Sequence, residues 1–105
     1  MIVQTPSPPY YAVIFSSVRT EVSDDYIETD DHLMNIAKDI DGFYGMESAR
    51  NELGIAVSYW RDLEAIDQWR HNADHGRAKV RAREEWYAAY KIRICKVEED
   101  RGFVK

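Results

Sequence analysis

The sequence has little of several residue types and segments, and each shortage excludes a class of protein. Cys95 is the only cysteine among 105 residues, so neither an intrachain disulfide nor a thiolate metal cluster can form. No apolar run approaches the length of a membrane-spanning helix, and the N-terminus lacks the basic-then-apolar pattern of a secretion signal. We therefore expect a cytoplasmic protein that does not associate with a membrane.

Positive charge is also scarce, because 14 Lys and Arg residues stand against 19 Asp and Glu residues. Domains that bind nucleic acid need a basic surface, so we expect no nucleic-acid partner. Apolar residues, in contrast, make up 45% of the chain, which is enough for one hydrophobic core. Three Phe, seven Tyr and three Trp residues are many for this length, and aromatic residues often line pockets and subunit interfaces.

All three prolines lie within the first nine residues, and this predicts an extended segment over residues 1–9. Residues 10–105 contain no internal repeat or linker and predict a single domain. Apolar and polar residues within it alternate or recur at strand and helix spacing, and Asp62 is a candidate N-cap of the second helix. The predicted elements are a strand at 10–19, a helix from 23 to 41, strands at 43–50 and 55–60, a helix from 62 to 82 interrupted at 72–76, and a strand at 87–97.

This order of elements is the split βαβ pattern. It predicts an α+β, ferredoxin-like fold in which both helices cover one face of a four-stranded antiparallel sheet. The second face of the sheet then carries more apolar residues than a monomer normally exposes. Residues assigned to that open face are Val13, Phe15, Val57, Tyr59 and Ala89. We expect a homodimer in which two open sheet faces pack together.

Several short motifs together resemble the antibiotic biosynthesis monooxygenase (ABM) domain family, part of the dimeric α+β barrel group. The motifs are Gly42-Phe43, Gly45, Glu47-Ser48, Arg50, Gly54, Ser58-Tyr59-Trp60, Glu64-Ala65, Trp69, His71, His75, Ala78 and Trp86-Tyr87. The resemblance implies a ligand cleft between the helices and the sheet of each subunit. It also implies a reaction without metal or flavin, in which a small phenolic substrate loses a proton and its anion reacts directly with O2.

A second branch of the same family degrades haem, and its pattern matches this sequence less well. That branch uses an Asn on the first strand, a Trp on the second helix and an iron-binding His. Trp69 matches the helical Trp, but residues 10–19 contain no Asn. Lys79 stands where the iron ligand is expected, with His75 one helical turn earlier. The resemblance therefore favours a cofactor-independent reaction, with haem as the alternative.

Six residues are candidates for the site. His75 is a candidate general base, because a neutral imidazole can take a phenolic proton near neutral pH. His71 lies four residues before it, a spacing that can bind metal, but no third ligand has an obvious place, so we expect no metal. Trp69 either stacks on an aromatic ligand or packs in the core. Trp60 is the second candidate to line the cleft, and core packing is its alternative as well.

Arg50 either stabilises a substrate oxyanion or has a structural role, in an ion pair with Glu47 or in polar contacts near the hairpin. Tyr87, with Tyr90 on the same strand, either donates a hydrogen bond to the ligand or lies in the core or an interface. The sequence thus predicts a cofactor-independent ABM-type monooxygenase that acts on a small aromatic or quinol-like compound. The alternatives are a haem-binding or haem-degrading monooxygenase and a non-catalytic dimer that binds a small molecule.

Overall fold

The computed structural model describes residues 2–21, 36–72 and 85–105. They form the strands β1 (Tyr10–Arg19), β2 (Phe43–Arg50), β3 (Gly54–Trp60) and β4 (Tyr87–Val97) and the helix α2 (Leu63–His71). Every predicted strand is confirmed to within one residue at each end. Most of the first predicted helix, and the second helix beyond residue 72 with its predicted interruption, lie outside the described residues.

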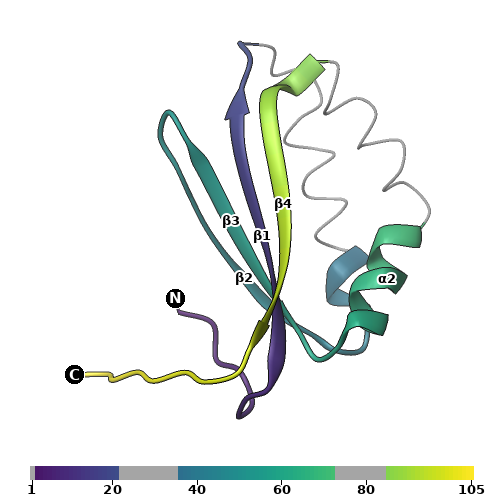
Figure 1. The fold of residues 1–105 in the computed structure, drawn as a ribbon, viewed down its shortest axis with the longest axis vertical. Coiled ribbons are helices and arrows are strands. Elements are labelled where there is room, and N and C mark those ends of the chain that lie inside the picture. The colour runs from purple at the N-terminus through teal and green to yellow at the C-terminus, as the bar shows by residue number, and fades with distance from the viewer. Residues whose placement is uncertain (1, 22–35, 73–84) are drawn as a thin grey trace.

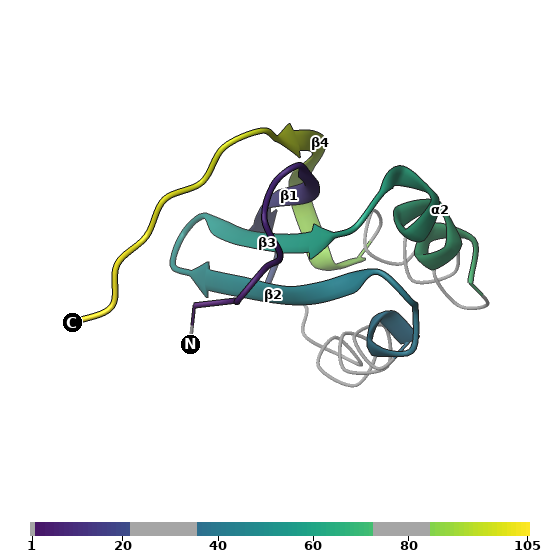
Figure 2. The same cartoon turned by 90° about the horizontal axis from the view of Figure 1, so that it is seen from below.

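The four strands form one antiparallel sheet in the order β2-β3-β1-β4, so β1 and β3 are central and β2 and β4 are edges. Helix α2 and the short helical turn at residues 36–38 lie on one side of this sheet, as Figures 1 and 2 show. This arrangement is the predicted α+β, ferredoxin-like fold. Among the described residues, no helix is long and apolar enough to cross a membrane.

The strand register decides which side chains face the helices. Residues opposite each other in antiparallel strands share a face, and Val13 lies opposite Ser58 and Ile94, on the same face as Trp60. Val13 belongs to the buried core, so its predicted place on the open face is wrong, as is that of Phe15, two residues further along. The apolar run in β1 does not alternate, and it therefore gives no information on which residues face which side.

Val57, Tyr59 and Ala89 do lie on the open face. Tyr59 opposes Ala12, Val57 opposes Ile14, and Ala89 opposes a residue of β1 in the same alternating set. Three of the five residues assigned to the open face are therefore found there.

The hydrophobic core lies between α2 and the end of the sheet where β3 finishes. Its buried members are Val13, Ala37, Ile40, Trp60, Ala65 and Ile66. Asp62 caps α2 by accepting a hydrogen bond from the Ala65 N–H at 2.8 Å, which confirms the predicted N-cap. Gly42 has φ +99°, and a Cβ there would lie 3.0 Å from the Ala65 Cβ, so glycine is required by both backbone and packing.

The register of β4 shifts once, and this shift redirects a side chain. Val18 pairs with Ala89 and Arg19 with Tyr87, which leaves Ala88 as an extra residue in a β-bulge. Tyr87 and Tyr90 are three residues apart and would face opposite sides of a regular strand. The bulge brings both rings to the helix-facing side, where their centroids are 5.9 Å apart.

Candidate functional site

The helix-facing side of the sheet has two ends with different character. We call the region around Trp60, Trp69 and α2 the core end, and the region around Arg50, Ser17 and Tyr90 the Arg50 end. On β1, Tyr11 lies at the core end and Ser17 lies at the Arg50 end. The two positions are six residues apart, which is about 20 Å along a strand. The residues predicted for one site are therefore divided between two places.

The core end is filled by aromatic side chains. Trp60 has 0% of its surface exposed, and its indole N–H donates to Ser58 Oγ at 2.9 Å. The half-buried Trp69 packs on Trp60 with a ring-centroid distance of 5.4 Å, and Phe43 packs there at 4.9 Å. In this chain both tryptophans contact core residues, and Trp60 presents no surface to a ligand.

His71 lies in the last turn of α2, exposed to solvent, with its Nδ1 2.7 Å from the Asp67 carbonyl oxygen. Because a carbonyl oxygen can only accept, the ring N–H donates to it, and the imidazole is hydrogen-bonded to its own helix. His75, the predicted general base, lies outside the described residues. Within the three described ranges, no group of three His, Cys, Asp or Glu residues is placed to hold a metal ion.

The Arg50 end begins with a row of four residues that crosses the whole sheet. Arg50 on β2 pairs with Gly54 on β3, Gly54 with Ser17 on β1, and Ser17 with Tyr90 on β4. The Arg50 guanidinium reaches along this row, where Nη2 donates to Ser17 Oγ and Nη1 donates to the Ser17 carbonyl oxygen at 3.4 Å. A side chain that starts on an edge strand thus places its charge over a central strand.

The predicted ion pair between Arg50 and Glu47 is wrong. Glu47 points to the open face of the sheet, where its Oε1 accepts a hydrogen bond from the Tyr59 hydroxyl at 2.6 Å. Its Oε2 accepts from the Val3 N–H at 2.9 Å. The two residues are three apart on a strand, so they face opposite sides. Among the residues that the structure describes, no carboxylate pairs with Arg50, and its contacts with Ser17 are the polar contacts near the hairpin that were the other predicted structural role.

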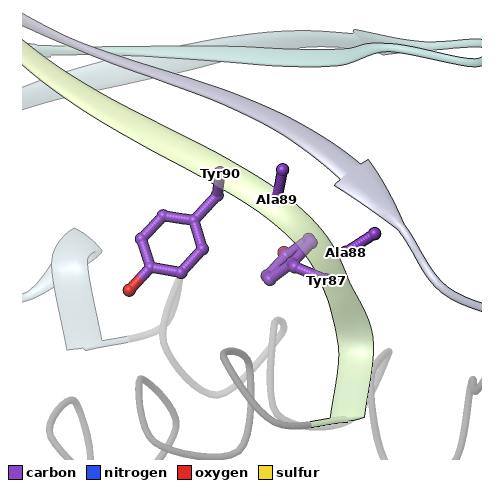
Figure 3. A pocket seen from close by; sticks show the side chains of 4 residues that line it. All are labelled: Tyr87, Ala88, Ala89 and Tyr90. Carbon is purple, nitrogen blue, oxygen red and sulfur yellow. The ribbon is translucent and has the colours of Figure 1, made fainter.

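Three aromatic rings gather on β1 and β4, on the same side of the sheet as Ser17. Phe15 lies 5.3 Å from Tyr87 and 5.6 Å from Tyr90 between ring centroids, and we call these three residues the aromatic cluster. An open pocket of about 460 Å³ is lined by Tyr87, Ala88, Ala89 and Tyr90. Figure 3 shows both tyrosine rings projecting from one side of β4 at this pocket, with Ala89 pointing to the other side.

The shifted pKa values of the tyrosine and glutamate pair belong to the open face. Burial, reinforced by the hydrogen bond to Glu47, raises the pKa of Tyr59 to about 12. Donation from the Tyr59 hydroxyl and the Val3 N–H lowers the pKa of Glu47 below its ordinary value. This pair joins the N-terminal segment to the sheet and is separated from Arg50 by the sheet itself.

Sequence reasoning overlooked three residues of the Arg50 end, because Phe15, Ser17 and Gly54 were assigned no role in the site. Tyr90 was named with Tyr87 as a candidate hydrogen-bond donor to a ligand. One signal was available in the sequence. Ser16 and Ser17 interrupt an otherwise apolar strand, which marks a buried polar contact. Gly54 looked like an ordinary turn residue, since the contact that needs its missing side chain depends on strand register.

Comparison with known proteins defines the family. The sequence profile described as "Antibiotic biosynthesis monooxygenase" matches residues 9–81, well over half of the chain. The chain belongs to this family. The match includes Arg50, Trp69 and His75 but ends before Tyr87 and Tyr90. The predicted family membership is therefore confirmed, while much of the aromatic cluster comes from a part of the chain that the profile does not cover.

Relatives agree with this assignment and show the fold. The chain is 47% identical over 102 residues to "Uncharacterized protein YqjZ" from Bacillus subtilis, which covers 95% of this chain and 90% of that protein. SnoaB, a cofactor-independent oxygenase from Streptomyces nogalater, has a similar structure with a TM-score of 0.73 at 7% identity, covering 89% of this chain and 97% of that one. Rv0793 from Mycobacterium tuberculosis also gives a TM-score of 0.73, at 11% identity over 89% of this chain and 99% of that one.

Proposed function

We propose that this protein is a cofactor-independent monooxygenase that oxidises a small aromatic or quinol-like compound with O2. The observation that carries the proposal is a guanidinium without a carboxylate partner among the described residues. It is held by Ser17, and the strand neighbour of Ser17, Tyr90, lines a pocket together with Tyr87. Membership of the family supports the reaction class, and the fold is shared with a cofactor-independent oxygenase.

The reaction balances without an external reductant. A ring CH₂ made acidic by a neighbouring phenol or ketone loses a proton to a base, and the resulting anion gives an electron to O2. Recombination forms a carbon–oxygen bond, and loss of water from the peroxide leaves a carbonyl. One oxygen atom enters the product and the other leaves in water, while the substrate carbon supplies all four electrons. The protein has to position the ring and stabilise the anion.

The Arg50 end supplies groups for both tasks. The aromatic cluster offers ring faces and edges to a flat substrate, with Tyr87 and Tyr90 at the pocket. Arg50 offers the charge that stabilises the anion formed by proton loss. His75 remains the predicted base, and its position is a prediction of the sequence alone. The proposal does not require Trp69, Trp60 or His71 to contact the substrate, because they lie at the core end or on the exposed last turn of α2.

Oxygen uptake tests the proposal directly. The purified protein, treated with a chelator, is mixed with a panel of anthrones and naphthols, which carry the reacting ring CH₂ or form it by tautomerism, and O2 consumption is followed with and without protein. We expect uptake above the spontaneous rate for at least one compound, with one atom of ¹⁸O2 in the product. Arg50→Met is expected to lower kcat/KM by about 100-fold, as loss of one oxyanion donor does.

Arg101→Met is the matched control, because Arg101 lies in the exposed C-terminal tail, 88% of its side chain accessible. It is expected to retain full activity. Uptake no faster than the spontaneous rate across the whole panel would contradict the proposal, as would an Arg50→Met variant with wild-type kcat/KM.

A second candidate, a non-catalytic dimer that binds a small molecule, is favoured by the filled core end. Trp69 packs on a fully buried Trp60 at the place where the sequence predicted a cleft. Binding of panel compounds without O2 uptake would establish this candidate in place of the first.

We also propose that two chains pack through their open sheet faces as a two-fold dimer. The open face carries Ile14, Val57 and Tyr59, and Ile55 and Val18 are 43% and 41% exposed on it. Light scattering coupled to size exclusion is expected to give a dimer mass. Val57→Lys is expected to give a monomer, whereas Val104→Lys in the exposed tail retains the dimer. A monomeric wild-type protein at micromolar concentration would disprove the dimer.

A further inference from the structure

We propose that Ser17 and Gly54 are positioning residues that hold the Arg50 guanidinium over the sheet, so that the pocket selects aromatic compounds carrying an ionised oxygen. The ligand class is an aromatic carboxylate or phenolate. This inference rests on the proposed function in one respect, since it places the ligand at the same Arg50 end. It goes further by naming what holds the charge in place and what that charge selects.

Ser17 is the first part of the argument. Its side chain is only 2% exposed, and a buried hydroxyl normally needs a hydrogen-bond partner. Arg50 supplies that partner through Nη2, and Nη1 contacts the carbonyl of the same residue. One residue therefore binds two nitrogens of the guanidinium. A guanidinium has five N–H groups, so donors remain for a ligand.

Gly54 is the second part. It lies between Arg50 and Ser17 in the row, and it is buried beneath the guanidinium. A Cβ at this position would overlap Cζ and Nη2 of Arg50 and would lie 2.6 Å from Nε. Its φ is outside the left-handed region, so the backbone accepts any residue there. The missing side chain thus serves one purpose, which is passage of the Arg50 side chain across β3.

The third part is what surrounds the charge. Tyr90 lies opposite Ser17 on the neighbouring strand, and Phe15 packs against its ring. A guanidinium beside aromatic rings matches a flat ligand with an acidic oxygen, because a planar guanidinium can bind a carboxylate with two hydrogen bonds. A neutral ligand of the same shape would gain the ring contacts without the charge-assisted hydrogen bonds. The property to measure is therefore the ratio of the affinities for the charged and the neutral ligand.

Equilibrium dialysis with 2-naphthoate and the neutral 2-naphthamide tests the inference at pH 7. The wild-type protein is expected to bind naphthoate about tenfold more tightly than naphthamide, the scale of a charged hydrogen bond. Arg50→Met is expected to abolish this ratio. Ser17→Ala and Gly54→Ala are each expected to lower the ratio about threefold or more while naphthamide binding stays unchanged. Ser17→Thr restores the hydroxyl and is expected to restore the ratio.

The controls separate positioning from folding. A merely structural role for Ser17 or Gly54 would weaken both ligands equally, and that result would overturn the inference. Equal binding of naphthoate and naphthamide by the wild type would also overturn it. Gly54→Ala keeps the test decisive where Ser17→Ala fails to fold. The binding measurement needs no turnover. A protein that prefers naphthoate to naphthamide but consumes no O2 refutes only the proposed function. A protein that consumes O2 without this preference refutes only this inference.

Discussion

The core end and the Arg50 end lie on the same side of one sheet, but the first is closely packed and the second is open. At the core end, Trp60 is fully buried and α2 covers it, so the side chains satisfy one another. At the Arg50 end there is an open pocket, and Arg50 has no acidic partner among the described residues, so its remaining N–H groups can bind a ligand. Close packing yields stability, whereas a site needs groups whose interactions a ligand completes. The difference separates residues expected to matter for folding from residues expected to matter for binding.

The largest expected effect is the loss of Trp60. Trp60→Ala removes a fully buried indole and leaves a cavity, so the free energy of unfolding should fall by about 3–5 kcal/mol. Urea denaturation followed by circular dichroism measures this change. Tyr90→Ala truncates a half-buried side chain at the pocket and serves as the comparison. It should lower the free energy of unfolding clearly less than Trp60→Ala does. A Trp60→Ala loss smaller than that of Tyr90→Ala would reverse the assignment of the two ends.

The next effect should appear at the Arg50 end, in function more than in stability. Arg50→Met is expected to lower the free energy of unfolding by about 1–2 kcal/mol, because it leaves the buried Ser17 hydroxyl without its hydrogen-bond partner. The same variant should lose the naphthoate preference. Parallel denaturation and dialysis on one preparation measure both quantities. A stability loss comparable with that of Trp60→Ala would show that Arg50 belongs to the core.

A smaller effect is expected from the cap of α2. Asp62→Ala removes the acceptor for the Ala65 N–H and should lower the free energy of unfolding by about 1 kcal/mol. Asp62→Asn keeps an acceptor and should retain most of the stability in the same denaturation assay. Ligand binding at the Arg50 end should be unchanged in both variants. Altered binding would indicate that the two ends are coupled through the sheet.

The smallest effect concerns the reverse side of the sheet and tests whether it is independent of both ends. The folded pKa of Tyr59 is raised to about 12, above the unfolded value of about 10. Unfolded chains therefore lose this proton first, and the stability that it contributes is present below pH 10 and lost as pH rises from about 10 to about 12.

Denaturation at pH 9 and pH 11 measures this loss, and Tyr59→Phe should show a smaller difference between the two pH values than the wild type. Absorbance titration of the tyrosinate gives a second readout. An unchanged pH dependence in Tyr59→Phe would mean that another group, such as Tyr10, whose pKa is also raised by its hydrogen bond to Asp100, controls alkaline stability.

Much of the secondary structure followed from local patterns. The β-branched and aromatic run at β1, the acidic residue before α2 and the glycine after Asp41 each act through their own backbone and nearest neighbours. Such features can be found in a sequence, because the interactions that produce them span only a few residues. Family membership followed in the same way from short motifs spread along most of the chain.

The residues of the candidate site could be predicted from the sequence much less well, because their positions depend on the register of the strands. Arg50 was predicted either to pair with Glu47 or to bind an anion, and only the alternation of β2 places these two side chains on opposite faces. Tyr87 was predicted for a ligand, but its place beside Tyr90 depends on the bulge at Ala88. A one-residue shift in pairing changes the face of a side chain, and no local pattern records it.

The sequence alone determined the strands, the cap of α2, the fold class and the family, because each depends on local preferences or on recurring motifs. The tertiary structure decided that Trp69 and Arg50 lie at different ends of the sheet, and that Ser17 and Gly54 join Arg50 in one row. In this row, Arg50 and Gly54 are 4 positions apart in the sequence, whereas Gly54 and Ser17 are 37 positions apart. Strand pairing and packing bring them together, and these form only when the whole sheet does.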